Sequence, residues 1–351
     1  MFKTILMPFD GSEPTTHALP YATALARATQ GRLVLTYALA PWELSFDAPL
    51  RLYDIGTELR EAGLDVTTHI APPHLGNPGR AILAMAGEVG ADVIVMGTHA
   101  YGSVGRALFG SVADYVVRHS TLPVLVCTPL ADRVWPEERP RRILVPLDGS
   151  ALAETALSPA REIAREIGAS LDLVGAIDLA TVAAIDHAVQ VGAYLEMLAG
   201  ETRGYLERVA EDLRQEGTVV DVQARAGVPD AVVTQLADEL SSDLIVMATH
   251  GRGVSRMLLG SVALRILQRS TVPVLLIHPA AAIVERTTTT PIEAGARPAG
   301  EQTYLALTAA ELELLRRSLE LLRHGSGSEQ QSQEGVTRLL NRLPKPPVPA
   351  L

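Results

Sequence analysis

The sequence repeats itself at long range, and this repeat constrains the fold more than any other feature. Three blocks recur in the same order, and the first includes the run Pro-x-Asp-Gly-Ser in both copies. The matched blocks are 1–12 with 139–150, 91–99 with 242–250, and 109–126 with 259–276. A unit of this length is too long for a solenoid repeat. The chain is therefore predicted to contain two copies of one domain, over residues 1–130 and 139–280.

Each copy alternates short apolar runs with amphipathic stretches, which predicts βαβ units and a parallel sheet. The expected strands are 4–9, 33–38, 66–70, 92–97 and 124–127, then 142–147, 171–177, 219–223, 243–248 and 274–277. The expected helices include 12–29, 50–61, 78–89, 111–119 and a long one over 193–216. Right-handed crossovers make such a chain doubly wound, so the fold class is α/β with two five-stranded parallel sheets. Ligands in this architecture bind at the carboxyl ends of the strands.

The last strand of each copy follows a proline, which suits a strand at the edge of a sheet. An open edge invites aggregation unless it is paired or covered. Residues 124–127 and 274–277 therefore fit two edge strands whose open backbone groups need a partner.

Composition excludes several classes of partner. The net charge is −10, and an acidic surface repels the phosphate backbone of nucleic acids. The sequence contains no apolar run near the ~20 residues that span a bilayer, so we expect a soluble cytoplasmic protein. Cys127 is the single cysteine; it lies in an apolar run and is interpreted as a core residue.

Polar residues follow the first strand of each copy. Asp10 and Asp148 come directly after these strands and are each followed by Gly-Ser. An aspartate at this position can accept hydrogen bonds from a ribose or an adenine edge. Ser12 and Ser150 are better interpreted as caps of the following helix.

A second motif follows strand four and opens the next helix. It consists of Gly97, Thr98 and His99 with Gly110 and Ser111 in copy one, and of Ala248, Thr249, His250 and Gly251 with Gly260 and Ser261 in copy two. A turn of small residues lets backbone N–H groups approach phosphates, and a helix N-terminus favours an anion. The alternative is that these glycines only form a tight turn and allow close packing of helix on strand.

The order of these motifs resembles the universal stress protein family over residues 1–129 and 139–279. The resemblance implies ATP as ligand, with or without Mg²⁺, in one or both domains. Because members of this family commonly dimerise through the last strand, it also implies that residues 124–127 pair with 274–277, so that the two copies form an intramolecular pseudo-dimer. It places Asp10 and Asp148 beside the adenosine, and Ala38 and Ala176, at the ends of strand two, near the adenine. It places the residues of the second motif along the ribose and phosphates: Gly97, Thr98, His99, Gly110, Ser111, His250, Gly251, Gly260 and Ser261.

Both copies depart from the family pattern of Gly, two residues, Gly, nine residues, Gly-Ser. Copy one has Ala100 in place of the second glycine. Copy two has Ala248 in place of the first, and its loop is one residue shorter. Arg252 and Arg256 add charge to the second loop, but backbone donors must converge on fixed oxygens. We therefore expect copy one to be the better ATP site.

Enzymatic activity is not indicated. The sequence has no Gly-x-x-x-x-Gly-Lys-Ser/Thr motif, no histidine or cysteine at metal spacing from His99 or His250, and no evident catalytic residue. Any ATP hydrolysis should be slow. The alternative function is an interaction module that binds no nucleotide and acts by dimerising or docking partners.

The remaining chain has a different composition. Residues 281–302 predict a linker, and 303–351 predict a short helical tail with leucines at helical spacing. Such helices cannot bury their apolar faces alone. Docking on the core, docking on another subunit and loose attachment all remain open, as does a further homo-oligomer.

Overall fold

The computed structural model describes residues 2–38, 47–71, 77–98, 110–131, 135, 139–178, 191–249 and 259–278. Copy one comprises β1 (Thr4–Pro8), α1 (Glu13–Thr29), β2 (Arg32–Ala38), α2 (Asp47–Glu61), β3 (Val66–Ala71), α3 (Pro78–Glu88), β4 (Val93–Gly97), α4 (Ser111–His119) and β5 (Val124–Cys127). These elements agree with the predicted order, and their ends shift by a few residues at most. The predicted linker and tail lie outside the described residues.

Copy two repeats this order with two changes. It comprises β6 (Arg142–Pro146), α5 (Ala151–Glu154), α6 (Leu157–Ile167), β7 (Ser170–Ile177), α8 (Val191–Gln215), β8 (Val220–Ala226), α9 (Pro229–Glu239), β9 (Leu244–Ala248), α10 (Ser261–Arg269) and β10 (Val274–Ile277). The first helix is divided into α5 and α6, and α8 is the long helix that the sequence predicts. The predicted α/β fold is therefore confirmed in both copies.

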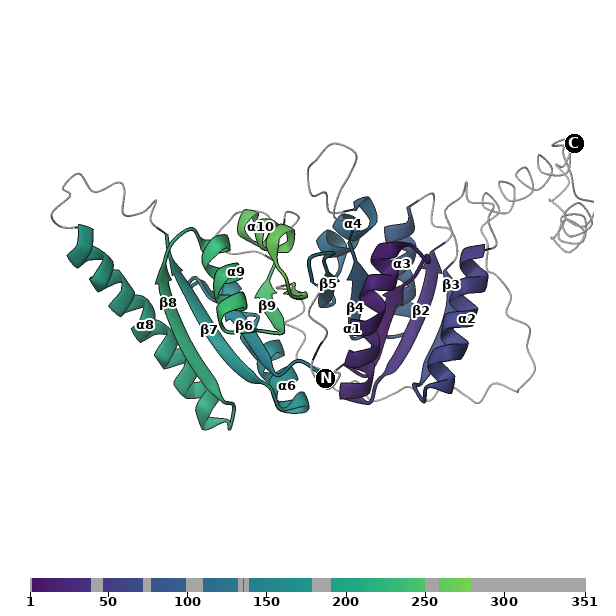
Figure 1. The fold of residues 1–351 in the computed structure, drawn as a ribbon, viewed down its shortest axis with the longest axis horizontal. Coiled ribbons are helices and arrows are strands. Elements are labelled where there is room, and N and C mark those ends of the chain that lie inside the picture. Colours follow the sequence, from purple (N-terminus) through teal and green to yellow (C-terminus); the bar gives the residue numbers. More distant parts are fainter. Residues whose placement is uncertain are drawn as a thin grey trace, which may run out of the picture. The chain divides into compact units, whose positions relative to one another are not determined.

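All ten strands form one sheet, in the order β3-β2-β1-β4-β5-β10-β9-β6-β7-β8 (Figure 1). Strands within each copy run parallel. The two last strands, β5 and β10, pair antiparallel, with Val126 opposite Val274 and Val124 opposite Leu276. The pairing predicted for these strands is thus confirmed, and it leaves β3 and β8 as the edges of the sheet.

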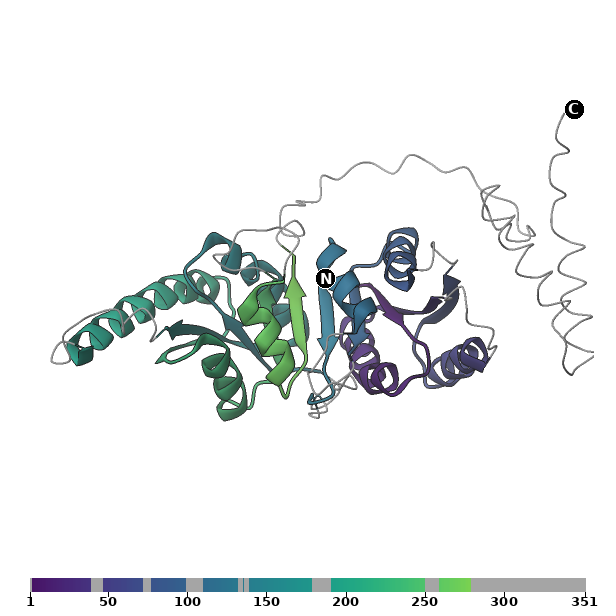
Figure 2. The ribbon, with the colours of Figure 1, turned by 90° about the horizontal axis from the view of Figure 1, so that it is seen from above.

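Helices cover both faces of the sheet, and each face has its own core (Figure 2). Alternate strand residues point to opposite faces, as the two-residue period of a strand requires. One core contains Met7, Leu35 and Val95 under α1, α2, α6 and α8, and the other contains Leu6 and Ile94 under α3, α4, α9 and α10. Cys127 is fully buried, which confirms its interpretation as a core residue.

The segment between the copies is pinned by aromatic residues. Trp135 is buried, and its Nε1 donates to the backbone oxygen of Asp243 at 3.0 Å. The Trp135 ring packs edge-on against Tyr21 at 5.5 Å, and the Tyr21 hydroxyl donates to the Ala131 oxygen at 2.6 Å. Residues from both copies therefore hold Ala131 and Trp135 in place.

Candidate functional site

The residues after β1 and β6 form matching turns. Asp10 Oδ1 accepts from the Ser12 N–H at 2.9 Å, and Asp148 Oδ1 accepts from the Ser150 N–H at 2.9 Å. The intervening glycines have φ of 76° and 77°, a left-handed conformation that glycine adopts without steric cost. Both aspartates are exposed. Each copy therefore presents a carboxylate fixed by its own turn.

The two serines behave differently. Ser150 Oγ accepts from the Ala153 N–H at 3.2 Å, so it caps α5 as predicted. Ser12 makes no side-chain cap bond at α1, and the cap prediction is wrong there. The Thr15 hydroxyl of copy one donates to Asp10 Oδ1 at 2.9 Å and lies 3.4 Å from Ser12 Oγ, so Ser12 Oγ lies beside Thr15 and bonds no helix N–H group.

The strand ends bring the predicted residues to one edge of the sheet. β1 lies between β2 and β4, and all three run parallel, so Asp10, Ala38 and Gly97 follow or end neighbouring strands at the same edge. The Phe9 N–H donates to the Thr36 oxygen at 2.8 Å, which places the Asp10 turn beside the end of β2. The matching bond of copy two, from Leu147 N–H to the Val174 oxygen, is also 2.8 Å and places Asp148 near Ala176.

The starts of α4 and α10 have the same backbone geometry. Gly110 has φ and ψ of −56° and 145°, and Gly260 has −58° and 146°. Neither glycine-led start has a side-chain cap among the described residues, and Ser111 and Ser261 are exposed. The Gly260 N–H donates to the Thr249 oxygen at 2.9 Å, so the start of α10 lies beside the end of β9. Backbone donors and a favourable helix dipole are thus available at both starts.

Thr98 and Thr249 continue the hydrogen bonding of the sheet one residue beyond β4 and β9. Both are buried, and their N–H groups donate to the Cys127 oxygen at 3.1 Å and the Ile277 oxygen at 2.9 Å. His99, His250 and Gly251, which the sequence also assigns to the site, lie outside the described residues.

Gly97 has a packing role that the structure shows directly. A Cβ atom on Gly97 would lie 1.9 Å from the backbone oxygen of Pro14, so only glycine lets the first turn of α1 approach β4 this closely. Copy two has Ala248 at the equivalent position, and its first helix is interrupted at Thr155 and Ala156. The alternative in which this glycine serves close helix–strand packing is therefore supported at Gly97.

Sequence reasoning missed a cation beside the first turn. Arg51, from α2, reaches over Gly11, and its Nη1 lies 3.4 Å from the Gly11 oxygen. In copy two the Tyr205 hydroxyl of α8 donates to Glu154 Oε1 at 2.7 Å. When the two copies are aligned at Arg60 and Arg214, Arg51 and Tyr205 occupy the same position in the repeat. That alignment is the sequence signal that could have pointed to Arg51 and Tyr205.

The helix starts also differ in charge. The first turn of α4 contains Asp114, whose two carboxylate oxygens accept from Arg118 Nε at 2.8 Å. This hydrogen bond raises the pKa of the Arg118 guanidinium, against the lowering effect of its burial. The first turn of α10 contains no acidic residue. The helix start thus favours an anion in copy two, whereas Arg51 favours one at the strand-one turn of copy one.

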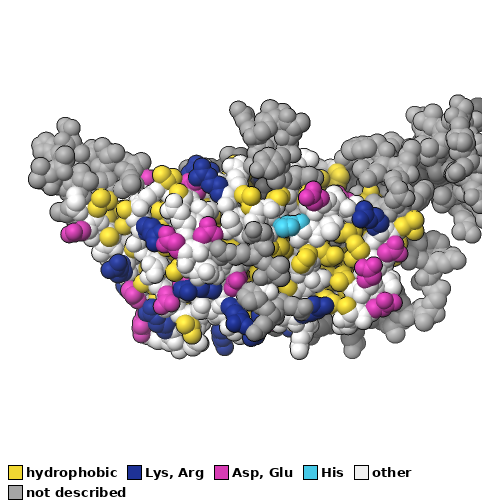
Figure 3. Space-filling model, in the orientation of Figure 1, with side chains coloured by type: hydrophobic (Ala, Val, Ile, Leu, Met, Phe, Trp, Pro, Cys, Tyr) yellow, Lys and Arg dark blue, Asp and Glu magenta, His cyan; other side chains and the backbone are white. Residues whose placement is uncertain are grey.

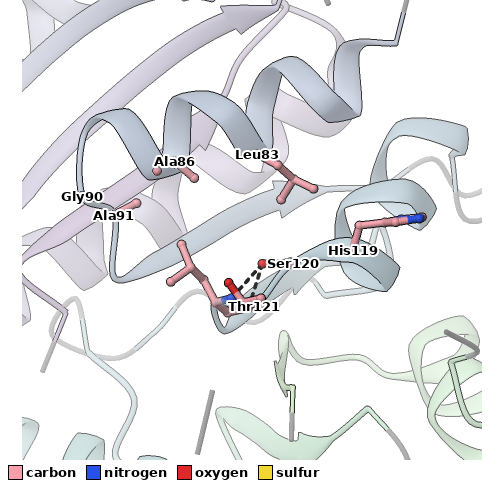
Figure 4. Close-up of a pocket in the computed structure, with 9 residues that line it drawn as sticks. Leu83, Ala86, Gly90, Ala91, His119, Ser120 and Thr121 are labelled. Carbon is pink, nitrogen blue, oxygen red and sulfur yellow. Dashed lines mark hydrogen bonds between the residues drawn. The ribbon is translucent and has the colours of Figure 1, made fainter. Parts of the chain in front are cut away.

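A separate hollow of about 220 Å³ lies between α3 and the start of β5 (Figure 4). It is lined by Leu83, Ala86, Gly90, Ala91, His119 and Thr121, among others. Ala91 precedes β4 and Thr121 precedes β5, so the hollow is at the amino ends of these strands. It is therefore at the opposite edge of the sheet from the predicted site.

Within the described residues, no group of three His, Cys, Asp or Glu side chains could hold a metal ion. The helices of the described part are also too short or too polar to cross a membrane. Acidic and basic side chains are interspersed over the face that Figure 3 shows.

The chain matches the model of the universal stress protein family twice, over residues 1–128 and 140–278. A universal stress protein of Mycobacterium tuberculosis is 33% identical over 190 residues, which cover 53% of this chain and 61% of that protein. One from Thermus aquaticus is 36% identical over 135 residues, covering 36% of this chain and 98% of the relative. The crystal structure of a universal stress protein from Archaeoglobus fulgidus has a TM-score of 0.58 at 22% identity, covering 80% of this chain and 99% of that one.

The mycobacterial alignment leaves more than a third of that relative unmatched, since it covers 61% of its length. The Archaeoglobus structure shares the fold over nearly its whole length. Two family domains in tandem agree with the two copies that the repeat and the sheet define. The chain belongs to the universal stress protein family.

Proposed function

We propose that this universal stress protein binds adenine nucleotides and acts in a stress response or in regulation, with ATP bound best by copy one. One observation carries the proposal. In copy one, the Asp10 turn follows β1 and the uncapped helix start at Gly110 follows β4, and these two parallel strands are adjacent in the sheet. Both features recur in copy two with nearly the same backbone angles. The carboxylate suits the hydroxyl groups of a ribose, and the helix start suits a phosphate.

The ranking of the sites is tested by blocking each helix start in the full chain. Gly110 and Gly260 have negative φ, so glutamate can replace either one without backbone strain. A carboxylate there would repel phosphates from that site alone. In a calorimetric titration with ATP, we expect Gly110→Glu to weaken binding strongly and Gly260→Glu to change it little. Loss of binding in Gly260→Glu with intact binding in Gly110→Glu would reverse the ranking.

A specific observation favours the second candidate, an interaction module without nucleotide. Gly97 is needed for the packing of α1 on β4, so its presence does not require a ligand. Copy two has lost this glycine altogether. The two functions are separated by denaturing the purified protein and measuring absorbance in the released small-molecule fraction. An adenine spectrum in that fraction supports nucleotide binding. If calorimetric titration of the full chain with ATP or adenosine gives no heat of binding, the interaction module is favoured.

A further inference from the structure

Arg51 and Tyr205 occupy the same position in the repeat. Leu52 and Leu206, the residues after them, are both fully buried in the same core. Further along the two helices, Arg60 Nη1 donates to the Val66 oxygen and Arg214 donates in the same way to the Val220 oxygen. The separation in sequence between Arg51 and Tyr205 equals that between Leu52 and Leu206 and that between Arg60 and Arg214. The two side chains can therefore be compared directly.

In copy one this position supplies a cation. The Gly11 Cβ position would lie 3.4 Å from Arg51 Nη1 and 3.6 Å from its Cδ and Cζ, so the guanidinium and its stem cover the turn that holds Asp10. Arg51 is exposed, as is Asp10. The guanidinium places a positive charge beside the Gly11 backbone of this turn, and its N–H groups that do not face the Gly11 oxygen can donate to an anionic ligand.

In copy two the same position holds Tyr205, whose hydroxyl is already hydrogen-bonded to a carboxylate. Tyr205 donates to Glu154, and Glu154 replaces Thr16 of copy one. Burial, the hydrogen bond to Glu154 and the charges of Glu154 and Asp148 raise the pKa of Tyr205, with Arg208 opposing the rise. The negative charges of Glu154 and Asp148 thus lie near the Tyr205 hydroxyl, so they repel a phosphate group at this place. Their carboxylate oxygens can still accept hydrogen bonds from ribose hydroxyls.

We propose that this helix position sets the charge of the ligand that each domain accepts: Arg51 adapts copy one to phosphorylated adenine nucleotides, and the Tyr205–Glu154 pair adapts copy two to the uncharged nucleoside. The inference rests on the proposed function and adds a ligand class to each site. The charge difference at the strand-one turns agrees with the expected ranking and is independent of loop length, whereas the first turn of α10, which contains no acidic residue, favours an anion in copy two.

The first test uses the full chain with Gly260→Glu, so that ATP binding reports copy one. Arg51→Tyr introduces the residue of copy two, and Arg51→Lys is the matched control that keeps the charge. We expect Arg51→Tyr to weaken ATP binding about tenfold, because one charge pair near a protein surface contributes this order of free energy. Arg51→Lys should retain most of the affinity. The adenosine affinity should be unchanged by Arg51→Tyr, because adenosine carries no charge.

The second test uses the full chain with Gly110→Glu, in which ATP binding reports copy two. Glu154→Gln removes one carboxylate and keeps an acceptor for the Tyr205 hydroxyl, and we expect it to strengthen ATP binding by about five- to tenfold. If Arg51→Tyr and Arg51→Lys bind ATP as tightly as their parent, the inference is overturned and the proposed function stands. If neither ATP nor adenosine binds the unmodified chain, both fail together.

Discussion

The ion pair of Arg142 and Asp172 allows a stability prediction for which the equivalent residues of copy one serve as a reference. Arg142 Nε lies 2.5 Å from Asp172 Oδ2, and Nη2 lies 2.8 Å from Oδ1. The Asp172 side chain is 1% exposed and that of Arg142 is 34% exposed. The equivalent residues of copy one are Thr4 and Val34, which form no ion pair. The double variant Arg142→Thr, Asp172→Val therefore has a folded precedent within the same chain.

The two single variants should differ sharply. Arg142→Thr leaves Asp172 buried opposite Asp221, its register partner on β8, and removal of one partner from a buried pair costs about 3–5 kcal/mol. Asp172→Val leaves Arg142 partly exposed and still 3.9 Å from Asp221, so we expect a cost of about 0–1 kcal/mol. The double variant should lie within about 1 kcal/mol of the wild type, because replacing a buried pair by apolar residues is often neutral or stabilising.

Urea unfolding measured by circular dichroism and by tryptophan fluorescence gives the free energies. Trp135 is hydrogen-bonded to the Asp243 oxygen just before β9, the neighbour of β6, so the emission reports this region once Trp42, the other tryptophan, is replaced by phenylalanine in all variants. The control is Arg32→Ala, which breaks the exposed pair with Asp65 and should change the free energy of unfolding by less than about 1 kcal/mol. Equal costs for the two single variants, or a double variant whose cost is their sum, would refute the reasoning.

Three further experiments test individual packing statements. Thr36→Val should raise the free energy of unfolding by roughly 1–2 kcal/mol in urea melts, because the fully buried hydroxyl has no partner among the described residues and copy two has Val174 there. Gly97→Ala should lower it by roughly 1–3 kcal/mol, since the new Cβ meets Pro14, whereas Ala248→Gly should cost less. Cys127 should not react with a thiol reagent at pH 8 until denaturant is added, because burial raises the pKa of its thiol and reaction requires the thiolate; rapid native labelling would contradict this.

The fold could be predicted because its signals are local and occur twice. The apolar runs of 4–9 and 142–147, for example, alternate with amphipathic stretches in both copies, and period and length determine strand or helix. The pairing of β5 with β10 was expected from the resemblance to a family that commonly dimerises through the last strand, and it agreed with the prolines Pro123 and Pro273 that precede these strands. Such inferences need no knowledge of which side chains meet across the fold.

The candidate site was only partly predictable because its differences depend on contacts between distant segments. The carboxylate turn at Asp10 was evident, but only the structure shows that Ser12 Oγ lies beside the Thr15 hydroxyl and does not cap α1. A glycine at position 97 would also suit a phosphate-binding turn, and only the position of Pro14 shows that Gly97 has a packing role. Arg51 is one of many arginines in the sequence. The repeat alignment pairs its position with Tyr205, but only the tertiary fold shows that Arg51 lies over Gly11.

The duplication also separates the residues that stabilise a copy from those expected to contact its ligand. Arg142 begins β6 and Asp172 lies near the start of β7, so their ion pair is at the amino ends of the strands. Thr271 donates to Asp238 at 2.6 Å before β10, where copy one has Gly87 and the hollow of Figure 4. Charge has thus been added to copy two at the edge opposite the proposed nucleotide site. It follows that the Arg142→Thr, Asp172→Val variant should bind ATP with unchanged affinity, because neither residue reaches the carboxyl edge of the sheet.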